Sequence, residues 1–354
     1  MDKYIGMDVD IKKTVACVVT GPGDPGRYRT IATDVEAMQA FLRSERAGGY
    51  RTQVVFEVRG EAGWFYDNLE GYADEVVVCN PAQATWIYRT SKKNDRIDAR
   101  KLAVLLMMGE IPRVHMPSKS IRDWRSLILH RRVQVGQVTG VKSRIKAILR
   151  SQGCGKPAHK GSWWKQVNRE WMRQVAQGGI EMWRIRLSDE LAHLEMMESQ
   201  VRSTTKRLDA YLAGRPGGKL LMSIPGVGPR TAEAVLAYTD DVKRFSSSKE
   251  FCAYFGMTPK LDESGSCRRV GHISKKGPSV VRWLLCESSW IAKRKSPALK
   301  AFFDRVTGGQ PKRRKVANVA VGRKLLSIMR AMLLTGEMFN ESLVGRICAA
   351  DMAA

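Results

Sequence analysis

Two stretches of sequence, Tyr4-Ile-Gly-Met-Asp8 and Val54-Val55-Phe56-Glu57, decide the fold of the first third of the chain. Each is a short apolar run that predicts a buried strand, and each ends in a carboxylate. If the two strands pair in one sheet, both carboxylates converge on the same edge. A further acidic pair, Asp95 and Asp98, opens a strongly periodic helix. Residues three apart on a helix share one face, with side chains about 5–6 Å apart.

These four acidic residues, Asp8, Glu57, Asp95 and Asp98, predict a site for divalent metal. Carboxylates drawn together repel one another unless they are protonated or bridged by cations. Magnesium accepts oxygen ligands and keeps waters and substrate phosphates in its shell, and two ions about 3.5–4 Å apart can clamp both oxygens of a phosphoryl transfer. We therefore expect two Mg²⁺ ions, with Mn²⁺ as an alternative. Taken singly, Asp98 also fits a helix-dipole partner or an ion pair with Arg100, and Glu57 a surface acid.

The first 110 residues predict an α/β domain. The predicted strands cover residues 4–9, 13–20, 27–33, 52–58 and 75–79, and the predicted helices cover residues 34–46, 62–69 and 95–108. The close spacing of the first three strands favours antiparallel hairpins. The resulting order, βββαβαβα, matches the RNase H-like pattern of three antiparallel strands followed by βα units.

The remainder of the chain is predicted to be mainly helical. Residues 122–149 predict a long basic helix, and near-heptad apolar spacing over residues 184–212 predicts a coiled-coil arm within a region of residues 111–215. The stretch Ala213–Gly218 predicts a linker. A mostly helical domain of residues 216–354 follows, in which residues 258–274 are expected to form a mixed loop. Its predicted helices cover residues 229–238, 280–292 and 321–334.

The charge of the chain points to a polyanionic partner. Sixty Lys and Arg residues against 35 Asp and Glu residues give a net charge of +25, and phosphate backbones are the commonest partner for such an excess. Residues 111–169 contain fourteen Lys and Arg residues and one acid, Asp123. Five basic residues of this region are candidate nucleic-acid contacts: Arg131, Arg132, Lys142, Arg144 and Lys146. Trp163 and Trp164 would add stacking surfaces, although a Trp pair is more often part of a core.

Other global features favour a protein of the reducing cytoplasm. The seven cysteines are scattered without a C-x-x-C pair, which argues for free thiols rather than disulfides or a zinc ribbon. The sequence contains no uninterrupted apolar run of 18 residues, so we expect no membrane span. We therefore expect a cytoplasmic protein associated with the nucleoid, with no membrane partner.

Two segments of the C-terminal domain are further candidates for nucleic-acid contacts. Ile224-Pro-Gly-Val-Gly228 looks like a helix-hairpin-helix turn, in which Gly226 and Gly228 would let backbone N–H groups face a phosphate; an ordinary interhelix turn is the alternative. A second group of basic residues surrounds Ser264 and could position a phosphate by charge. For some of these residues, a solvated basic face is the alternative. This group comprises Arg268, Arg269, Lys275, Lys276 and Arg282.

The ordered set of motifs resembles one known family over nearly the whole chain. Y-I-G-M-D, V-V-F-E-V-R-G, N-P and K-N-D-R-I-D-A-R-K-L resemble the N-terminal half of the DEDD insertion-sequence transposases and the related Piv-type DNA invertases. The C-terminal half is similar to the same family through S-I-P-G-V-G-P-R-T-A, F-C-A-Y-F-G-M-T-P, E-S-G-S and G-H-I-S-K-K-G. One departure follows Glu57: the chain reads Val58-Arg59-Gly60 where the family has a small residue, then Thr or Ser, then Gly.

The resemblance implies a RuvC-like catalytic domain, a coiled-coil arm and a C-terminal transposase domain. It implies that Asp8, Glu57, Asp95 and Asp98 are the DEDD metal ligands, and that Ser264 is the nucleophile that takes up a DNA 5′-phosphate. It further implies a noncoding bridge RNA that pairs with donor and target DNA. Two protomers would complete each site within a dimer or tetramer.

The residues around Ser264 do not by themselves identify a nucleophile. A serine hydroxyl needs a base or a metal to activate it, and neighbouring strand residues such as Glu263 face away. Activation must then come from the metal cluster of another domain or subunit. Without the resemblance, Ser264 would be interpreted as a turn serine, and on sequence alone Ser266 and Ser274 are rival candidates.

Two other functions remain open at this point. A RuvC-type junction nuclease would use metal-activated water and need no serine. A non-catalytic nucleic-acid scaffold built on the helical arm would need none of the four acids.

Overall fold

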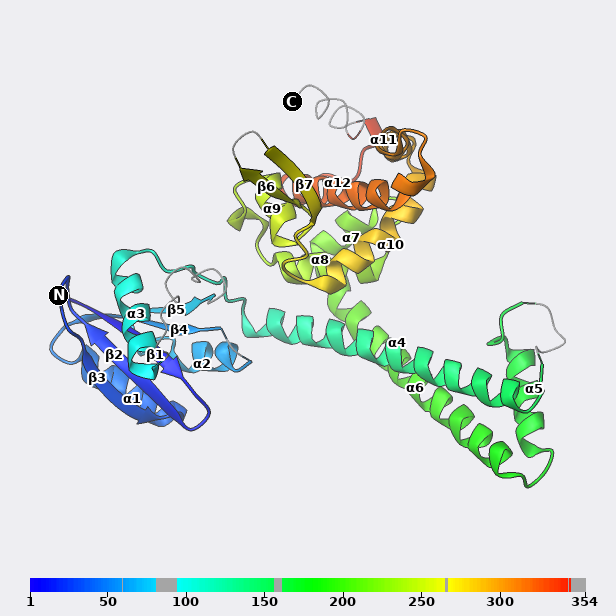
Figure 1. Cartoon of the computed structure of the whole chain (residues 1–354), viewed down its shortest axis with the longest axis horizontal. Coiled ribbons are helices and arrows are strands. Elements are labelled where there is room, and N and C mark those ends of the chain that lie inside the picture. The colour runs from blue at the N-terminus through cyan, green and yellow to red at the C-terminus, as the bar shows by residue number, and fades with distance from the viewer. Residues whose placement is uncertain (59, 81–93, 156–160, 265–266, 343, 345–354) are drawn as a thin grey trace. The chain divides into compact units, whose positions relative to one another are not determined.

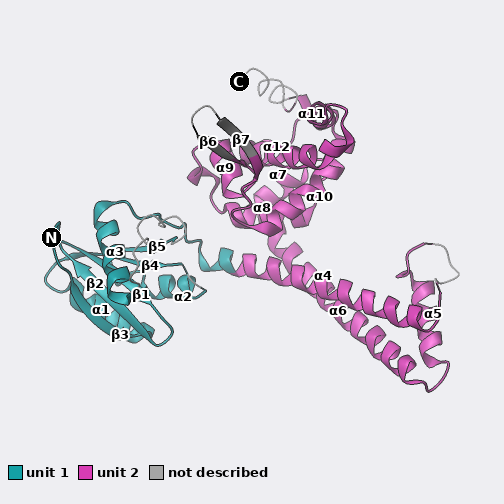
Figure 2. Cartoon of the chain, in the orientation of Figure 1, with its two compact units in different colours: residues 1–122 teal, residues 123–354 magenta. Residues whose placement is uncertain are grey.

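The computed structural model describes residues 1–58, 60–80, 94–155, 161–264, 267–342 and 344, and for residues 261–264 and 267–270 it describes the backbone alone. The chain divides into two compact units, Met1–Arg122 and Asp123–Ala354 (Figure 2). Within the described residues, no helix is both long enough and apolar enough to cross a lipid bilayer.

The first unit contains a five-stranded sheet in the order β3-β2-β1-β4-β5 (Figure 1). β1 and β2 are antiparallel, as are β2 and β3, whereas β4 is parallel to both β1 and β5. The strands are β1 (Asp2–Val9), β2 (Lys13–Val19), β3 (Arg27–Ala32), β4 (Arg51–Glu57) and β5 (Glu75–Cys79), and the helices are α1 (Val35–Arg46), α2 (Ala62–Leu69) and α3 (Asp95–Met108). The predicted order βββαβαβα and the antiparallel first three strands are confirmed.

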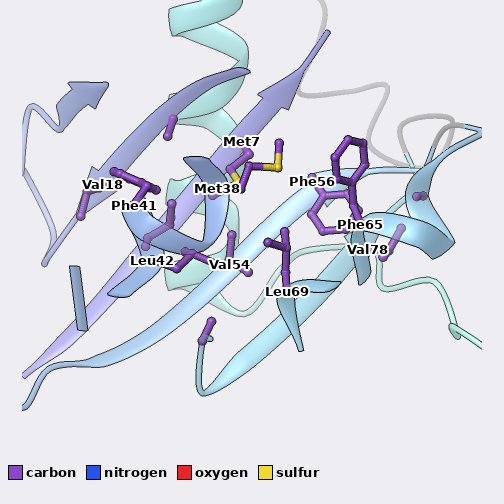
Figure 3. Packing of buried hydrophobic residues seen from close by; sticks show 14 residues of the cluster. Met7, Val18, Met38, Phe41, Leu42, Val54, Phe56, Phe65, Leu69 and Val78 are labelled. Atoms are coloured by element: carbon purple, nitrogen blue, oxygen red, sulfur yellow. The ribbon is translucent and has the colours of Figure 1, made fainter. Parts of the chain in front are cut away.

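Alternate residues of the strands face opposite sides of this sheet. Met7, Val54 and Phe56 point to the side covered by α1 and α2, where Figure 3 shows them packed with Phe65 and Leu69. The residues between them point to the other side, which α3 covers. The core cluster between the sheet and α3 includes Val55, Val77 and Cys79 of the strands and Leu102, Leu105 and Leu106 of the helix.

Gly6 lets α3 approach β1 very closely. A Cβ atom at Gly6 would lie 2.1 Å from the carbonyl oxygen of Ala99 and 2.5 Å from the amide nitrogen of Ala103. The backbone of the helix therefore rests on the strand at a position where only hydrogen fits. This contact fixes the first turns of α3 against β1.

Two long helices, α4 (Lys119–Ser151) and α6 (Met182–Ala213), lie side by side as a hairpin (Figure 1), which belongs to the second unit except for residues 119–122 of α4. Their apolar residues share one core with the short helix α5 (Gln166–Gln177). The polar contacts show that the helices are antiparallel, because Arg131, Lys142 and Arg144 of α4 meet Thr205, Glu198 and Glu190 of α6 in turn. The predicted helical arm is present, while coiled-coil packing within it stays a prediction.

The rest of this unit is mostly helical, as expected. Its elements are α7 (Pro216–Met222), α8 (Pro229–Thr239), α9 (Ser248–Tyr254), β6 (Pro259–Ser264), β7 (Cys267–Ile273), α10 (Ser279–Lys295), α11 (Pro297–Thr307) and α12 (Arg314–Thr335), with short 3₁₀ helices at Val242–Arg244 and Pro311–Arg313. Two predictions were wrong. The segment expected to be a mixed loop contains the β6–β7 hairpin, and the expected linker is shorter, because Pro216 already begins α7 at the first helical position that proline favours.

A buried carboxyl group of α8 makes the stability of this unit depend on pH. The side chain of Glu233 is 2% exposed and lies 3.2 Å from Arg230, and its Oε2 atom has no hydrogen-bond partner. Burial raises the pKa of Glu233 to about 7, although Arg230 and Arg131 act to lower it. Because the folded state holds this proton more tightly than the unfolded state, the stabilising contribution is complete below about pH 4.5 and is lost as the pH rises through about 7.

We expect Glu233→Gln to remove this loss. The variant should gain up to about 3 kcal/mol of unfolding free energy over the parent chain at pH 8 and should match it at pH 4.5. Urea unfolding at the two pH values measures the difference. A difference that stays constant across this range would contradict the assignment of the titration to Glu233.

Candidate active site and nucleic-acid interface

The pairing of β1 with β4 sets Asp8 and Glu57 beside each other. Met7 pairs with Phe56 in the parallel register, so the next residue along each strand, Asp8 or Glu57, lies at the same level of the sheet. Since Met7 and Phe56 face α1 and α2, the two acids face the α3 side. The expected convergence of the two strand ends is therefore observed.

Glu57 also lies next to Cys79 of β5, its partner in the β4–β5 register. Burial raises the pKa of the Cys79 thiol to about 11, and the negative charge of Glu57 contributes in the same direction. The effect agrees with a Glu57 carboxylate on the α3 side, close to the end of the sheet.

The first turn of α3 carries the other two acids. The side chain of Asn94 accepts a hydrogen bond from the amide of Arg96 and so starts the helix at Asp95. Asp98 directly precedes Ala99, whose carbonyl oxygen lies over Gly6, two residues before Asp8 on the same side of β1. The close approach at Gly6 thus brings the first turn of α3 to the level of Asp8.

Lysine side chains reach both helix acids. The Nζ atom of Lys13, at the start of β2, lies 3.5 Å from Asp95, and that of Lys101 lies 3.6 Å from the buried Asp98. Because Thr14 pairs with Val9, Lys13 marks the end of β1 that carries Asp8. Asp95 therefore lies at the same end of the sheet as Asp8.

The four acids lie at the same end of the sheet without forming a closed cage. Among the residues that the structure describes, no three His, Cys, Asp or Glu side chains are close enough to hold a metal ion. Carboxylates repel one another when no cation lies between them, and Lys13 and Lys101 neutralise only part of the charge. The set of donors, four carboxylates, is nevertheless the kind that hard divalent cations bind.

A cavity of about 230 Å³ adjoins Glu57. Asp10, Glu61, Trp64 and Phe65 line it, and Trp64 is 54% exposed. None of these four residues was predicted to be functional from the sequence. The one signal in the sequence was the aromatic residue Trp64 within the predicted helix of residues 62–69. The structure leaves Trp64 exposed, while Ala62 and Phe65 of the same helix are buried.

Ser264 is the last residue of β6 and pairs with Cys267, the first residue of β7. On β7, Arg268 pairs with Glu263 and Arg269 with Asp262. The hairpin thus holds Ser264 at its closed end and places two arginines on the adjacent strand. Arg59, Gly265 and Ser266 lie outside the described residues.

The other residues predicted around Ser264 have different environments. Lys275 and Lys276 are exposed. The guanidinium of Arg282, by contrast, donates to the carbonyl oxygens of Phe255, Lys276 and Gly277, at 3.2, 2.6 and 2.9 Å. Arg282 therefore fastens the segment that follows β7.

The two glycines of the predicted helix-hairpin-helix turn also differ. Gly226 has a φ of +89°, and a Cβ atom there would lie 2.6 Å from the amide nitrogen of Ala292 on α10. Close packing between the turn and α10 thus requires a glycine at this position. Gly228 is the residue before α8, and a Cβ atom there would meet nothing within 4 Å.

All five basic residues selected on α4 have partners within the protein. Arg131 donates to Thr205, Lys142 and Arg144 form ion pairs with Glu198 and Glu190, Arg132 lies over the ring of Trp283, and Lys146 lies near the rings of Trp163 and Trp164. Trp163 is 9% exposed and belongs to the core of the arm. Four of these residues have their partners within the arm, and Arg132 contacts α10, so protein contacts account for much of the basic character of the arm without nucleic acid.

Comparison with known proteins identifies relatives over both units. The model of the DEDD transposases of IS110 type matches residues 5–152, and the model described as "Transposase IS116/IS110/IS902 family" matches residues 218–304. The chain is 27% identical over 310 residues to protein y4rJ of Sinorhizobium fredii, a candidate transposase by name, covering 79% of this chain and 77% of the relative. It is 25% identical to the transposase for insertion sequence element IS1111A of Coxiella burnetii, over 81% of this chain and 79% of the relative.

A relative with a different role matches a shorter part. The pilin gene-inverting protein of Moraxella lacunata is 27% identical over 173 residues, which cover 48% of this chain and 50% of the relative.

Proposed function

Because the chain belongs to the DEDD transposases of the IS110 family, enzymes that cut and rejoin DNA, we propose that it is an RNA-guided transposase or site-specific recombinase that works through a covalent phosphoserine. Its partners would be donor DNA, target DNA, a structured noncoding guide RNA and further copies of the same chain, as a dimer or tetramer. It would act in the cytoplasm at the nucleoid. Three domains would carry this work: residues 1–110, the arm of residues 111–215 and residues 216–354.

One observation supports the catalytic part of this proposal above all. Asp8, Glu57 and the first turn of α3 lie on the same side and at the same end of one sheet. In our proposal Asp8, Glu57, Asp95 and Asp98 hold divalent cations, Mg²⁺ or Mn²⁺, which would supply charge neutralisation to a phosphoryl transfer. Lys13 and Lys101 keep the acids partly neutralised before a cation and a phosphate enter.

Ser264 would perform the covalent step. Its Oγ atom would attack the phosphorus of a DNA phosphodiester, form a phosphoserine bond to the 5′ side and break the bond to the 3′ oxygen. The serine loses its proton, and the released 3′ oxygen gains one. Attack of another 3′-hydroxyl on the phosphorus of the phosphoserine would break the bond to Ser264, return a proton to the serine and rejoin the DNA.

Ser264→Ala tests this step. We expect the variant to form no covalent DNA adduct and to lose strand cleavage by about 10³-fold or more, because a methyl group cannot form the ester. Denaturing gels of protein incubated with labelled DNA, its guide RNA and Mg²⁺ would show the adduct. The matched control is Ser274→Ala, in the segment after β7, which should retain it.

The outcome also separates the rival functions. If Ser264→Ala cleaves DNA normally, the chain is a junction nuclease that uses water. If the parent chain binds nucleic acid but cleaves no DNA with guide RNA and Mg²⁺ supplied, and replacement of the four acids leaves that binding unchanged, the chain is a non-catalytic scaffold. Inversion of a DNA segment, the role that the name of the Moraxella relative indicates, would follow from the same chemistry.

A further inference from the structure

The second unit has a large cavity whose described lining includes neither Ser264 nor the arm residues discussed above. It has a volume of about 790 Å³, within the range of 300–1,000 Å³ that is usual for ligand pockets. It lies between the end of α10, α11 and the start of α12, and we call it the α10–α11 cavity. Three of the residues that line it, Gln310, Pro311 and Arg314, lie beyond residue 304, where the match to the C-terminal family model ends.

The lining of the α10–α11 cavity is strongly cationic. Lys293, Arg294 and Arg314 line it, and no described carboxylate forms an ion pair with any of them. The one acid of the lining, Asp304, pairs with Lys300 at 2.9 Å. Burial lowers the pKa of Lys293, and the positive charge of Arg314 lowers it further.

Aromatic rings form another part of this wall. The centroids of Trp290 and Phe303 are 6.0 Å apart. The Nζ atom of Lys293 lies 4.1 Å from the centroid of the Trp290 ring and 3.5 Å from that of Phe303. Trp290 is partly exposed and lines the cavity, so its ring can offer a surface to a flat ligand.

Helix dipoles explain only some of these cations. Lys293 and Arg294 lie in the last turn of α10, where positive charge is favourable without any ligand. Arg314, however, is the first residue of α12, and a cation at a helix N-terminus opposes the dipole. A phosphate in the cavity would offset this repulsion, since helix N-termini bind phosphate readily.

We infer that the α10–α11 cavity binds a single strand of nucleic acid, with phosphates at Lys293, Arg294 and Arg314 and a base against Trp290. The inference rests on the proposed function, because recombination exposes unpaired strands. A duplex fits less well, since its bases are already stacked and paired. Both DNA and RNA have the required phosphates and bases.

Photo-crosslinking of the full chain locates the strand. Two 12-nucleotide strands of the same sequence, one DNA with 4-thiothymidine and one RNA with 4-thiouridine, would be crosslinked and the modified peptides identified by mass spectrometry. We expect crosslinks to a peptide containing Trp290, and the strand that gives them identifies the source. Crosslinks from both strands that fall only outside residues 290–314 would overturn the inference.

Binding measurements with matched variants test the charges. Lys293→Ala/Arg314→Ala removes two cavity cations, and the control Lys295→Ala/Lys312→Ala removes two exposed cations that do not line the cavity. By fluorescence anisotropy, the cavity variant should bind the single strand about tenfold more weakly. Its slope of log affinity against log salt should be less steep by about 1.4, because each lost phosphate contact removes about 0.7. Equal losses in both variants would contradict a specific site.

Trp290→Leu tests the stacking surface and keeps an apolar side chain beside Phe303. We expect about tenfold weaker binding of the single strand and unchanged binding of a duplex, with thermal unfolding as a check on folding. Equal weakening for both ligands in a folded variant would count against stacking. These assays contain no metal and no cleavage step. A chain that binds the strand at the cavity but never cuts DNA would therefore refute the proposed function alone.

Discussion

Asp98→Asn is expected to reduce strand cleavage by about 10³-fold or more and to leave DNA binding largely intact. The substitution keeps the shape of the buried side chain and removes one charge that would hold a divalent cation, which contributes several kcal/mol to a phosphoryl transfer. The free energy of unfolding should change by only about 1 kcal/mol, because relief of repulsion among the acids offsets the lost contact with Lys101. Cleavage of labelled DNA and anisotropy binding measure the two effects.

The matched control is Glu36→Gln. Glu36 is an exposed acid of α1, the helix that covers the opposite side of the sheet. The control should cleave DNA at the parent rate. Equal activity of Asp98→Asn and the control, with normal folding, would remove Asp98 from the proposed site.

Gly6→Ala is expected to destabilise the first unit and to impair cleavage together. The added methyl group would lie 2.1 Å from the backbone oxygen of Ala99, so α3 must move away from β1. Overpacking of this kind costs about 3 kcal/mol. A shift of about 1 Å in the first turn of α3 would also displace Asp98 from Asp8 and lower cleavage by about 10²-fold.

Gly21→Ala is the control for the loss of a glycine. Gly21 lies in the same unit, and an added Cβ atom would meet nothing within 4 Å. Its unfolding midpoint and cleavage rate should stay close to those of the parent chain. If Gly6→Ala also behaved in this way, the close contact between α3 and β1 would not position the acids.

Much of the first unit was predictable because its local signals agree. The predicted helices at residues 62–69 and 95–108 match α2 and α3 in both bounds. Asn94 caps the start of α3, and Gly109, with a φ of +74°, ends it. The placement of Asp8 next to Glu57 followed from two apolar strands that each end in an acid.

Contacts between distant elements could not be predicted from one sequence. The approach of Ala99 to Gly6 depends on how α3 packs on the sheet, and the pairing of Lys13 with Asp95 depends on that packing. On the arm, charge alone selected Lys142 and Arg144 as nucleic-acid contacts. Their acidic partners on α6 only meet them once the hairpin has formed.

The second unit contains elements that the pattern of apolar residues did not predict. The β6–β7 hairpin carries polar and charged residues at most positions, so it does not show the alternation of a half-buried strand. The start of α11 was visible in principle, because Ser296 caps the helix and Pro297 occupies its first position. The apolar pattern did not reveal the helix itself.

Binding of Mn²⁺ followed by electron paramagnetic resonance tests the central claim most directly. Free Mn²⁺ gives a sharp six-line signal that weakens when the ion is bound. We predict that the parent chain and Glu36→Gln bind the ion, and that Glu57→Gln and Asp98→Asn, each folded, bind it much more weakly. Unchanged Mn²⁺ binding by both Glu57→Gln and Asp98→Asn would contradict a metal site formed by the end of the sheet and the first turn of α3.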